Sequence, residues 1–242
     1  MDPSHQKFVL PRKRRRTFIW SLTLLTGLLL VFGFMYAYEV PGGIADWRYA
    51  RAIGLSGTLR IPIGKTPEEA VQRFRGGLEK RVIRQESIEG GKLLFLKQYN
   101  QKPENTDLQI EYVRKTWLGG WKWAMGGGYG YSLRPGSEEA FTYMSIRKSK
   151  GVSGPFPIVF GEVNNEKITN ITVTVGGKRA GEYAAKLIEY ARGQRLWYVE
   201  LPTSAETPYT IAAYNGAGES VASQSDNDSQ NFAYVLMPSS LK

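Results

Sequence analysis

An uncharged apolar run near the N-terminus limits what this 242-residue chain can fold into more than any other feature. Residues 17–38 carry no charge and are rich in Leu, Phe, Val and Ile. Because a helix rises 1.5 Å per residue, about 20 residues span the roughly 30 Å hydrocarbon core of a bilayer. Trp20 lies near one end of the run, and Tyr36 and Tyr38 lie near the other, as is typical of membrane interfaces. We therefore predict a transmembrane helix over residues 17–38, with the lipid bilayer as a partner.

The basic run at residues 12–16 predicts the orientation of this helix. Positive charges next to a span favour the cytoplasmic side, so residues 1–16 are expected to form a basic cytoplasmic tail. The C-terminal remainder is then extracytoplasmic, and the protein is a single-pass protein of the cell membrane. The alternative is a cleaved signal peptide, whose apolar region is about 7–15 residues long and ends at a small-residue cleavage site. Here the run is longer and Met35-Tyr36-Ala37 is bulky, so an uncleaved anchor is favoured.

The counts of cysteine and histidine exclude several kinds of catalytic and metal site. The chain has no cysteine, and its only histidine is His5 in the basic tail. Disulfide scaffolds, thiolate zinc sites, cysteine nucleophiles and serine–histidine triads are therefore excluded. Asp226, Asn227 and Asp228 place oxygen ligands close together, but the glycine and glutamate of an EF-hand are missing, which favours a solvated loop. We expect a non-catalytic protein without a metal or cofactor.

Charge is unevenly distributed over the part beyond the apolar run. Residues 39–150 carry 19 Lys and Arg against 12 Asp and Glu, whereas residues 151–242 carry 7 against 9. The basic half could attract anionic headgroups or anionic wall polymers. The alternative is a solvated surface without a ligand. Nucleic acid is not expected as a partner, because the basic half lies outside the cell in the predicted topology.

Residues 39–64 are predicted to form a connector and residues 65–150 an α+β domain. A short helix is expected over 45–53. A second helix begins with Thr66, Pro67 and Glu69, the pattern of a capping box with proline at the first helical position. Its apolar stripe continues through glycines 76 and 77, which weaken the middle of the helix, and consists of Val71, Phe74, Leu78 and Val82.

After this helix the apolar period changes to two, which indicates strands. An antiparallel meander is predicted from strands at 92–99, 108–117, 121–133 and 141–148. The glycines at 126–130 are not followed by the Lys-Ser/Thr of a phosphate loop, so a flexible hairpin turn is predicted there. One helix followed by this meander is an α+β domain.

The sequence Gly151-Val152-Ser153-Gly154-Pro155 predicts a domain boundary. Short strands are expected beyond it, at 156–163, 168–175, 195–201, 209–214, 219–223 and 232–237. Residues 178–192 fit either a helix or a strand, and strand is favoured. This density of strands is typical of a β-sandwich over residues 152–242.

This second half resembles the immunoglobulin-like modules of bacterial surface proteins. The resemblance rests on the segments 159–163, 168–173, 197–201 and 209–218, the last of which reads Tyr-Thr-Ile-Ala-Ala-Tyr-Asn-Gly-Ala-Gly. It covers about a third of the chain and implies an all-β immunoglobulin-like sandwich. The core disulfide of antibody domains is absent.

The densest aromatic group of the chain is the candidate ligand site. Flat aromatic rings beside a cation can stack on sugar rings or grip an anionic polymer. The alternative is that these rings form the core of the α+β domain. The candidate ligand-binding residues are Trp117, Trp121, Trp123, Tyr129, Tyr131 and Lys122.

These features together predict a membrane-anchored extracytoplasmic binding or scaffold protein of the bacterial cell envelope. Its expected partners are the bilayer and either an anionic wall polymer or another envelope protein. The alternative is a bitopic sensor or an assembly component of an envelope complex. A tail of 16 residues is too short for a folded effector, which favours the scaffold.

Overall fold

A computed structural model describes residues 12–77, 79–98, 105–132, 138–149, 151–152, 154–226 and 232–237, without the side chains of 12–17 and 178. Most of the predicted tail, together with Leu78, Asn227 and Asp228, lies outside these residues. The architecture is an N-terminal apolar helix followed by antiparallel β-sheets, as expected at this coarse level.

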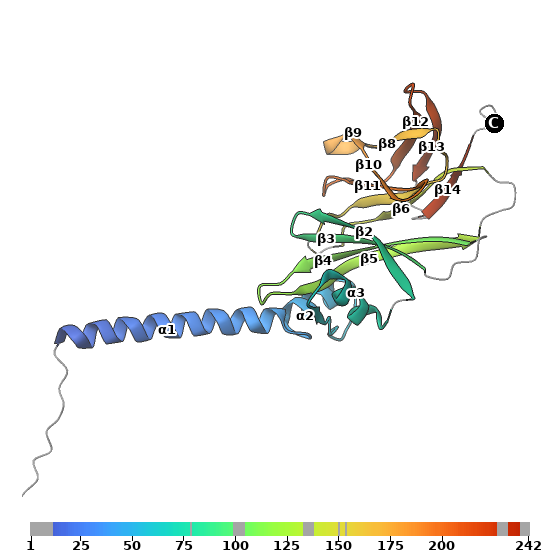
Figure 1. The fold of residues 1–242 in the computed structure, drawn as a ribbon. Coiled ribbons are helices and arrows are strands. Elements are labelled where there is room, and N and C mark those ends of the chain that lie inside the picture. The colour runs from blue at the N-terminus through green and yellow to red at the C-terminus, as the bar shows by residue number, and fades with distance from the viewer. Residues whose placement is uncertain are drawn as a thin grey trace, which may run out of the picture.

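Helix α1, Arg12–Glu39, projects away from the sheets (Figure 1). It is long and apolar enough to cross a membrane. The chain then turns at Gly42, whose φ of +83° suits glycine, and enters helix α2, Ile44–Ala52. The helix predicted in the connector is therefore present.

Helix α3, Pro67–Arg75, begins at the predicted capping residues. Thr66 Oγ1 accepts a hydrogen bond from the Glu69 N–H at 3.2 Å, and the Glu69 carboxylate accepts one from the Lys65 N–H at 2.6 Å. The helix ends sooner than predicted, because Gly76 adopts a left-handed φ of +78° that closes its C-terminus. Val82 consequently lies in strand β2, Lys80–Ile88, which the sequence analysis did not predict.

Sheet A has the strand order β1-β5-β4-β3-β2. Besides β2 it contains β1 (Ile63–Gly64), β3 (Gly91–Gln98), β4 (Asn105–Lys115) and β5 (Trp121–Ser132). All of its strand pairs are antiparallel.

The turn predicted in the glycine run is wrong, because glycines 126–130 lie inside β5. Gly126 pairs with Glu111 and Gly128 with Gln109. A Cβ atom at Gly126 would overlap the Glu111 carboxyl group, and one at Gly128 would lie 2.8 Å from the Cβ of Gln109. The glycines therefore leave room for side chains that cross from β4.

Sheet B has the order β10-β11-β7-β6-β14. Its strands are β6 (Glu139–Ile146), β7 (Ile158–Val163), β10 (Lys186–Ala191), β11 (Gln194–Glu200) and β14 (Phe232–Leu236). Strand β6 was expected to complete the meander of sheet A, but it pairs with β7 and β14 instead. The boundary expected at 151–155 thus falls between two neighbouring strands of one sheet.

Sheet C has the order β13-β12-β8-β9. Its strands are β8 (Ile168–Val175), β9 (Gly181–Ala184), β12 (Tyr209–Asn215) and β13 (Ser220–Asp226). A 3-10 turn, Gly177–Arg179, precedes β9. The ambiguous segment 178–192 is therefore mostly strand, as favoured.

The three sheets stack with sheet B in the middle (Figure 1). Sheets B and C enclose one core, which includes Phe141 and Trp197. Sheets A and B enclose a second core around Phe95 and Phe160. The outer face of sheet A packs against α3 in a third, smaller core, which includes Trp123. Sheet A is thus the layer that meets the helices.

Candidate functional site: the junction between α1 and sheet A

The aromatic residues singled out in the sequence do not share one surface. Trp123 is buried against α3, where its ring stacks on Phe74 with centroids 3.9 Å apart, and Trp121 packs partly into the same core. Tyr129 and Tyr131 belong to the core on the opposite side of sheet A. Strict alternation would place all four rings on one face, but a β-bulge at Ala124 shifts the alternation between Trp123 and Tyr129 and turns the tyrosines to the other face. The rings therefore mostly build cores.

Trp117 is the exception, with 60% of its surface exposed. It lies in the turn between β4 and β5, which is closed by a hydrogen bond from the Thr116 N–H to the Gly120 carbonyl at 3.1 Å. Its ring stacks on Tyr38 at the end of α1, with centroids 5.4 Å apart and planes 16° apart. The turn of sheet A thus touches the last residues of the apolar helix.

Lys122 is buried in this region, with a side-chain exposure of 1%. Its ammonium group lies 2.6 Å from a carboxylate oxygen of Asp46 and donates to the backbone carbonyl of Glu39 at 2.9 Å. The predicted cationic ligand contact is therefore an internal ion pair. Lys122 joins β5 to the end of α1 and to α2.

Arg114 completes the arrangement from the neighbouring strand. It pairs directly with Lys122 in the register of β4 and β5. Its two terminal nitrogens donate to the two carboxylate oxygens of Glu39 at 2.7 and 2.6 Å, a bidentate contact. We call Glu39, Asp46, Arg114 and Lys122 the junction cluster.

Asp46 also organises the connector. Its Oδ2 accepts hydrogen bonds from the Gly42 N–H at 2.7 Å and the Ile61 N–H at 2.9 Å. One buried carboxylate therefore holds the turn after α1, the segment before β1 and strand β5 together. A buried carboxylate with this many donors is well satisfied.

The electrostatics of the junction cluster are balanced, with two acids and two bases. Burial lowers the pKa of Lys122, and the hydrogen bond and charge of Asp46 oppose this shift. Burial also acts to lower the pKa of Arg114, but the hydrogen bonds and charge of Glu39 outweigh it and the pKa is raised. The cluster lines a cavity of about 260 Å³, which Tyr38 and Trp117 border.

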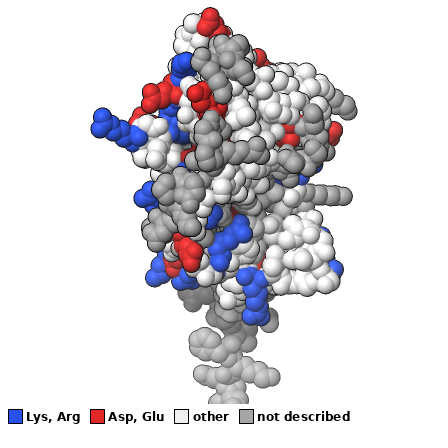
Figure 2. Space-filling view, turned by 90° about the vertical axis from the view of Figure 1, so that its right-hand side faces the viewer, with Lys and Arg blue, Asp and Glu red and all other residues white. Residues whose placement is uncertain are grey.

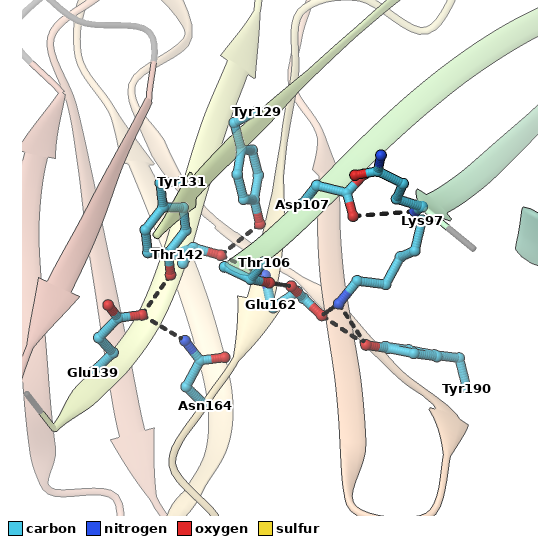
Figure 3. A network of polar contacts seen from close by, with 11 residues as sticks. Lys97, Thr106, Asp107, Tyr129, Tyr131, Glu139, Thr142, Glu162, Asn164 and Tyr190 are labelled. Atoms are coloured by element: carbon cyan, nitrogen blue, oxygen red, sulfur yellow. Dashed lines mark hydrogen bonds and ion pairs between the residues drawn. The ribbon is translucent and has the colours of Figure 1, made fainter. Parts of the chain in front are cut away.

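A second polar cluster joins sheets A and B (Figure 3). The Glu162 carboxylate lies 2.6 Å from the Lys97 ammonium and accepts hydrogen bonds from the hydroxyls of Tyr190 at 2.6 Å and Thr106 at 2.9 Å. We call these four residues the inter-sheet cluster. Burial, followed by the charge of Glu162, raises the pKa of Tyr190.

The predicted tyrosines lie beside the inter-sheet cluster (Figure 3). The Tyr129 hydroxyl is 2.6 Å from Thr142 Oγ1, and the Tyr131 hydroxyl donates to Glu139. Burial raises the pKa of both tyrosines. They are internal hydrogen-bonding groups of the interface.

The solvated loop expected around Asp226 is not what the structure contains at this residue. Asp226 is fully buried and accepts a hydrogen bond from Ser145 Oγ at 2.9 Å. Within the described residues, no group of three or more acidic or histidine side chains could hold a metal ion.

Sequence reasoning missed Glu39, Asp46 and Arg114. The available signal was the position of Glu39 as the first charge after the apolar run, but nothing local identifies its partner 75 residues further along the chain. Comparison of the chain with protein-family models, curated proteins and solved structures gives no match.

Proposed function

We propose that this protein is a non-catalytic, membrane-anchored scaffold or binding protein of the bacterial cell envelope. It crosses the membrane once, with its N-terminus in the cytoplasm and its sheets outside. The observation that carries the proposal is the junction cluster. A flexible tether needs only a linker after its anchor, whereas here Glu39 is buried and held by Arg114 and Lys122.

A fixed junction suits a protein whose sheets must point in a set direction. The four charges of the junction cluster connect α1, α2, β4 and β5 within one buried site. Because the ion pairs are buried, salt screens them less than surface charges. The sheets are therefore held in a fixed orientation relative to α1. A binding surface on the sheets then keeps its orientation to the membrane.

We further propose that sheets B and C form an immunoglobulin-like sandwich. If β6 is taken as strand A, the order β10-β11-β7-β6 corresponds to strands D, E, B and A. The order β13-β12-β8-β9 then corresponds to G, F, C and C′. These are the two sheets of that fold, and β14 is an addition beside strand A.

One side-chain contact supports the same proposal. Tyr209 begins β12, the strand that corresponds to F, and its hydroxyl donates to the Ala205 carbonyl at 3.4 Å. A tyrosine near the start of strand F that bonds back to the upstream backbone is the tyrosine corner of this fold. The buried Trp197 departs from the pattern, because it lies on the strand that corresponds to E rather than C.

This assignment predicts where the chain can be divided. A fragment of residues 138–242 retains β6 and should unfold cooperatively in urea, whereas a fragment of 152–242 lacks this central strand of sheet B and should not. Circular dichroism and intrinsic fluorescence during a urea titration measure both. A cooperatively folded 152–242 fragment would contradict the assignment of β6 as strand A.

The proposed partners are anionic, either headgroups or wall polymers. Support comes from the composition of residues 39–150, which carry 19 basic residues and 12 acidic residues. On the face drawn in Figure 2, Lys and Arg are more frequent over the lower half, where sheet A lies. Stacking on sugars has less support, since among the candidate aromatic residues Trp117 alone is mostly exposed, and its ring already stacks on Tyr38.

The runner-up is a bitopic sensor or assembly component, and the same junction cluster favours it, because a rigid link can also transmit a movement. The two functions differ in what α1 must do. A scaffold tolerates replacement of residues 17–37 by an unrelated apolar span, provided that Tyr38 and Glu39 are kept. A sensor or assembly component that uses contacts of α1 does not.

Two measurements test the proposed function. Protease added to intact protoplasts should remove everything beyond α1, and protection of the whole chain would contradict the topology. Energy transfer from a dye at residue 223 in sheet C to headgroup acceptors in a nanodisc should give a narrow distance distribution. Inserting a flexible Gly-Ser segment between Val40 and Pro41 should broaden it. An equally broad distribution without the insertion would contradict a fixed mount.

A further inference from the structure

Helix α2 has an exposed face of mixed apolar and basic character. Ile44, Trp47, Arg48 and Arg51 are all exposed and recur at steps of three and four, so they lie on one side of the helix. The opposite side, with Asp46 and Ala50, is buried. A helix face of large apolar residues and arginines is the pattern of a helix that lies in a membrane interface.

Large apolar side chains are unusually open in this part of the molecule. Trp47 is 49% and Trp117 is 60% exposed. Ile53 and Leu55, directly after α2, are each 42% exposed. Outside α1, these residues, Ile44 and Leu236 are the exposed large hydrophobic residues of the described chain. All but Leu236 belong to α2, the residues after it or the β4–β5 turn.

Both elements lie at the end of the apolar helix. The Gly43 N–H donates to the Val40 carbonyl at 2.7 Å, so α2 begins immediately beyond α1. Trp117 stacks on Tyr38, the last residue of the apolar run. Arg48 and Trp117 also border the same cavity. Figure 1 shows α2 beside the end of α1, with the β4–β5 turn reaching back toward α1.

We propose that the exposed face of α2 and the β4–β5 turn form a second membrane contact, which lies in the headgroup interface of the bilayer that α1 crosses. This proposal rests on the anchor of the proposed function. Trp47 and Trp117 insert their rings at the level where tryptophan is favoured. Arg48, Arg51 and Lys115 reach lipid phosphates, which arginine binds in a bidentate manner.

The bilayer fits this surface better than a protein partner does. The surface is continuous with the apolar span, and α2 starts too close to the end of α1 to lie far from the headgroups. An interface with a protein would not require the exposed ring of Trp117 to lie beside Tyr38. The consequence is that the end of sheet A that carries the β4–β5 turn faces the membrane (Figure 1).

The absence of cysteine allows single labelling sites in the full-length chain. Four variants, Leu28→Cys, Trp47→Cys, Trp117→Cys and Ser223→Cys, are spin-labelled and reconstituted into phosphatidylcholine vesicles with or without phosphatidylglycerol. Accessibility to oxygen and to a water-soluble nickel complex then reports depth. Leu28 tests the anchor, and Ser223, exposed in sheet C, is the water reference.

The ratio of oxygen to nickel accessibility at positions 47 and 117 should be several-fold above the ratio at 223 and below the ratio at 28. Phosphatidylglycerol in the vesicles should raise the ratio at 47 and 117 further. Ratios at both positions equal to that at 223, with position 28 buried in lipid, would overturn the second contact and leave the anchor intact. A water-accessible label at position 28 would overturn the anchor and the contact together. The Trp47 variant keeps the test valid if Trp117→Cys disturbs the stack on Tyr38.

Discussion

The junction cluster and the inter-sheet cluster both bury polar groups between parts of the molecule, but they are built differently. The junction cluster consists of four charged groups, and the side chains of Lys122 and Asp46 are each 1% exposed. The inter-sheet cluster contains one ion pair, Lys97 with Glu162, and completes it with neutral hydroxyl donors. One joint therefore relies on balanced charge and the other on hydrogen bonds.

This difference predicts different responses to mutation. Removing one partner of a buried ion pair leaves an uncompensated charge and costs about 3–5 kcal/mol. Removing a neutral donor costs about 1 kcal/mol, because the remaining donors still satisfy the carboxylate. A single substitution in the junction cluster should therefore cause a large loss of stability, whereas each substitution in the inter-sheet cluster should cause a smaller loss.

The largest effect is expected for Lys122→Met, which keeps the apolar stem and removes the ammonium group. Asp46 then remains buried without its counter-ion, and the free energy of unfolding should fall by about 3–5 kcal/mol. Urea unfolding of the full chain in detergent, followed by intrinsic fluorescence, measures this. Lys167→Met, in the exposed loop after β7, is the control and should change stability by less than about 0.5 kcal/mol.

A second substitution shows whether charge imbalance causes the loss. Adding Asp46→Asn to Lys122→Met removes the unpaired carboxylate but keeps an acceptor for the Gly42 and Ile61 N–H groups. The double variant should be more stable than Lys122→Met alone. If it is less stable by the full cost of both changes, shape rather than charge holds the junction together.

A smaller loss is expected for Arg114→Lys. Lysine keeps the charge but loses the planar fork that contacts both oxygens of Glu39. The expected cost is about 1–3 kcal/mol, in the range of a charge-assisted hydrogen bond, by the same urea titration. Arg192→Lys, in the exposed turn between β10 and β11, serves as the matched control. Equal stability of the two variants would show that the bidentate geometry contributes nothing.

The sequence predicted the elements that depend on neighbouring residues, such as helix caps and strands with alternating apolar residues. The start of α3 follows from Thr66, Pro67 and Glu69, and strands such as β4 and β8 follow from alternation. The end of α3 was predicted too late, because glycine both weakens a helix and closes it, and only the left-handed conformation of Gly76 decides between the two.

Pairing over long distances was not predictable in the same way. Strand β6 is apolar on both faces, with Phe141 and Tyr143 in one core and Met144 and Ile146 in the other, so its own pattern does not indicate which sheet it joins. The glycines of β5 suggested a turn because their purpose, space for Gln109 and Glu111, lies on another strand. The junction cluster was missed for the same reason, since its charges come from four separate elements.

In the inter-sheet cluster, Glu162→Gln should reduce stability by about 1–2 kcal/mol. The single amide oxygen replaces only one of the two carboxylate oxygens, so it keeps the donor on Oε1 or the one on Oε2, and Lys97 loses its counter-ion. Lys97 is only partly buried, at 14% side-chain exposure, so water can compensate in part. Glu166→Gln, in the exposed loop after β7, is the control for urea unfolding. A loss as large as that of Lys122→Met would remove the distinction between the two clusters.

The smallest effect at neutral pH is expected for Tyr190→Phe, about 1 kcal/mol for one hydroxyl donor. Its signature is the response to alkali. Burial and Glu162 raise the pKa of Tyr190 above its ordinary value, so the folded protein keeps the phenol proton while the unfolded chain releases it near pH 10. This stabilisation is complete below about pH 10 and is lost as the pH rises above it, by about 1.4 kcal/mol per pH unit for one proton. In urea titrations above pH 10, Tyr190→Phe should make the free energy of unfolding fall less steeply with pH, by the contribution of one proton. An unchanged slope would mean that Tyr190 ionises equally in both states, and the hydroxyl would then not be held by Glu162.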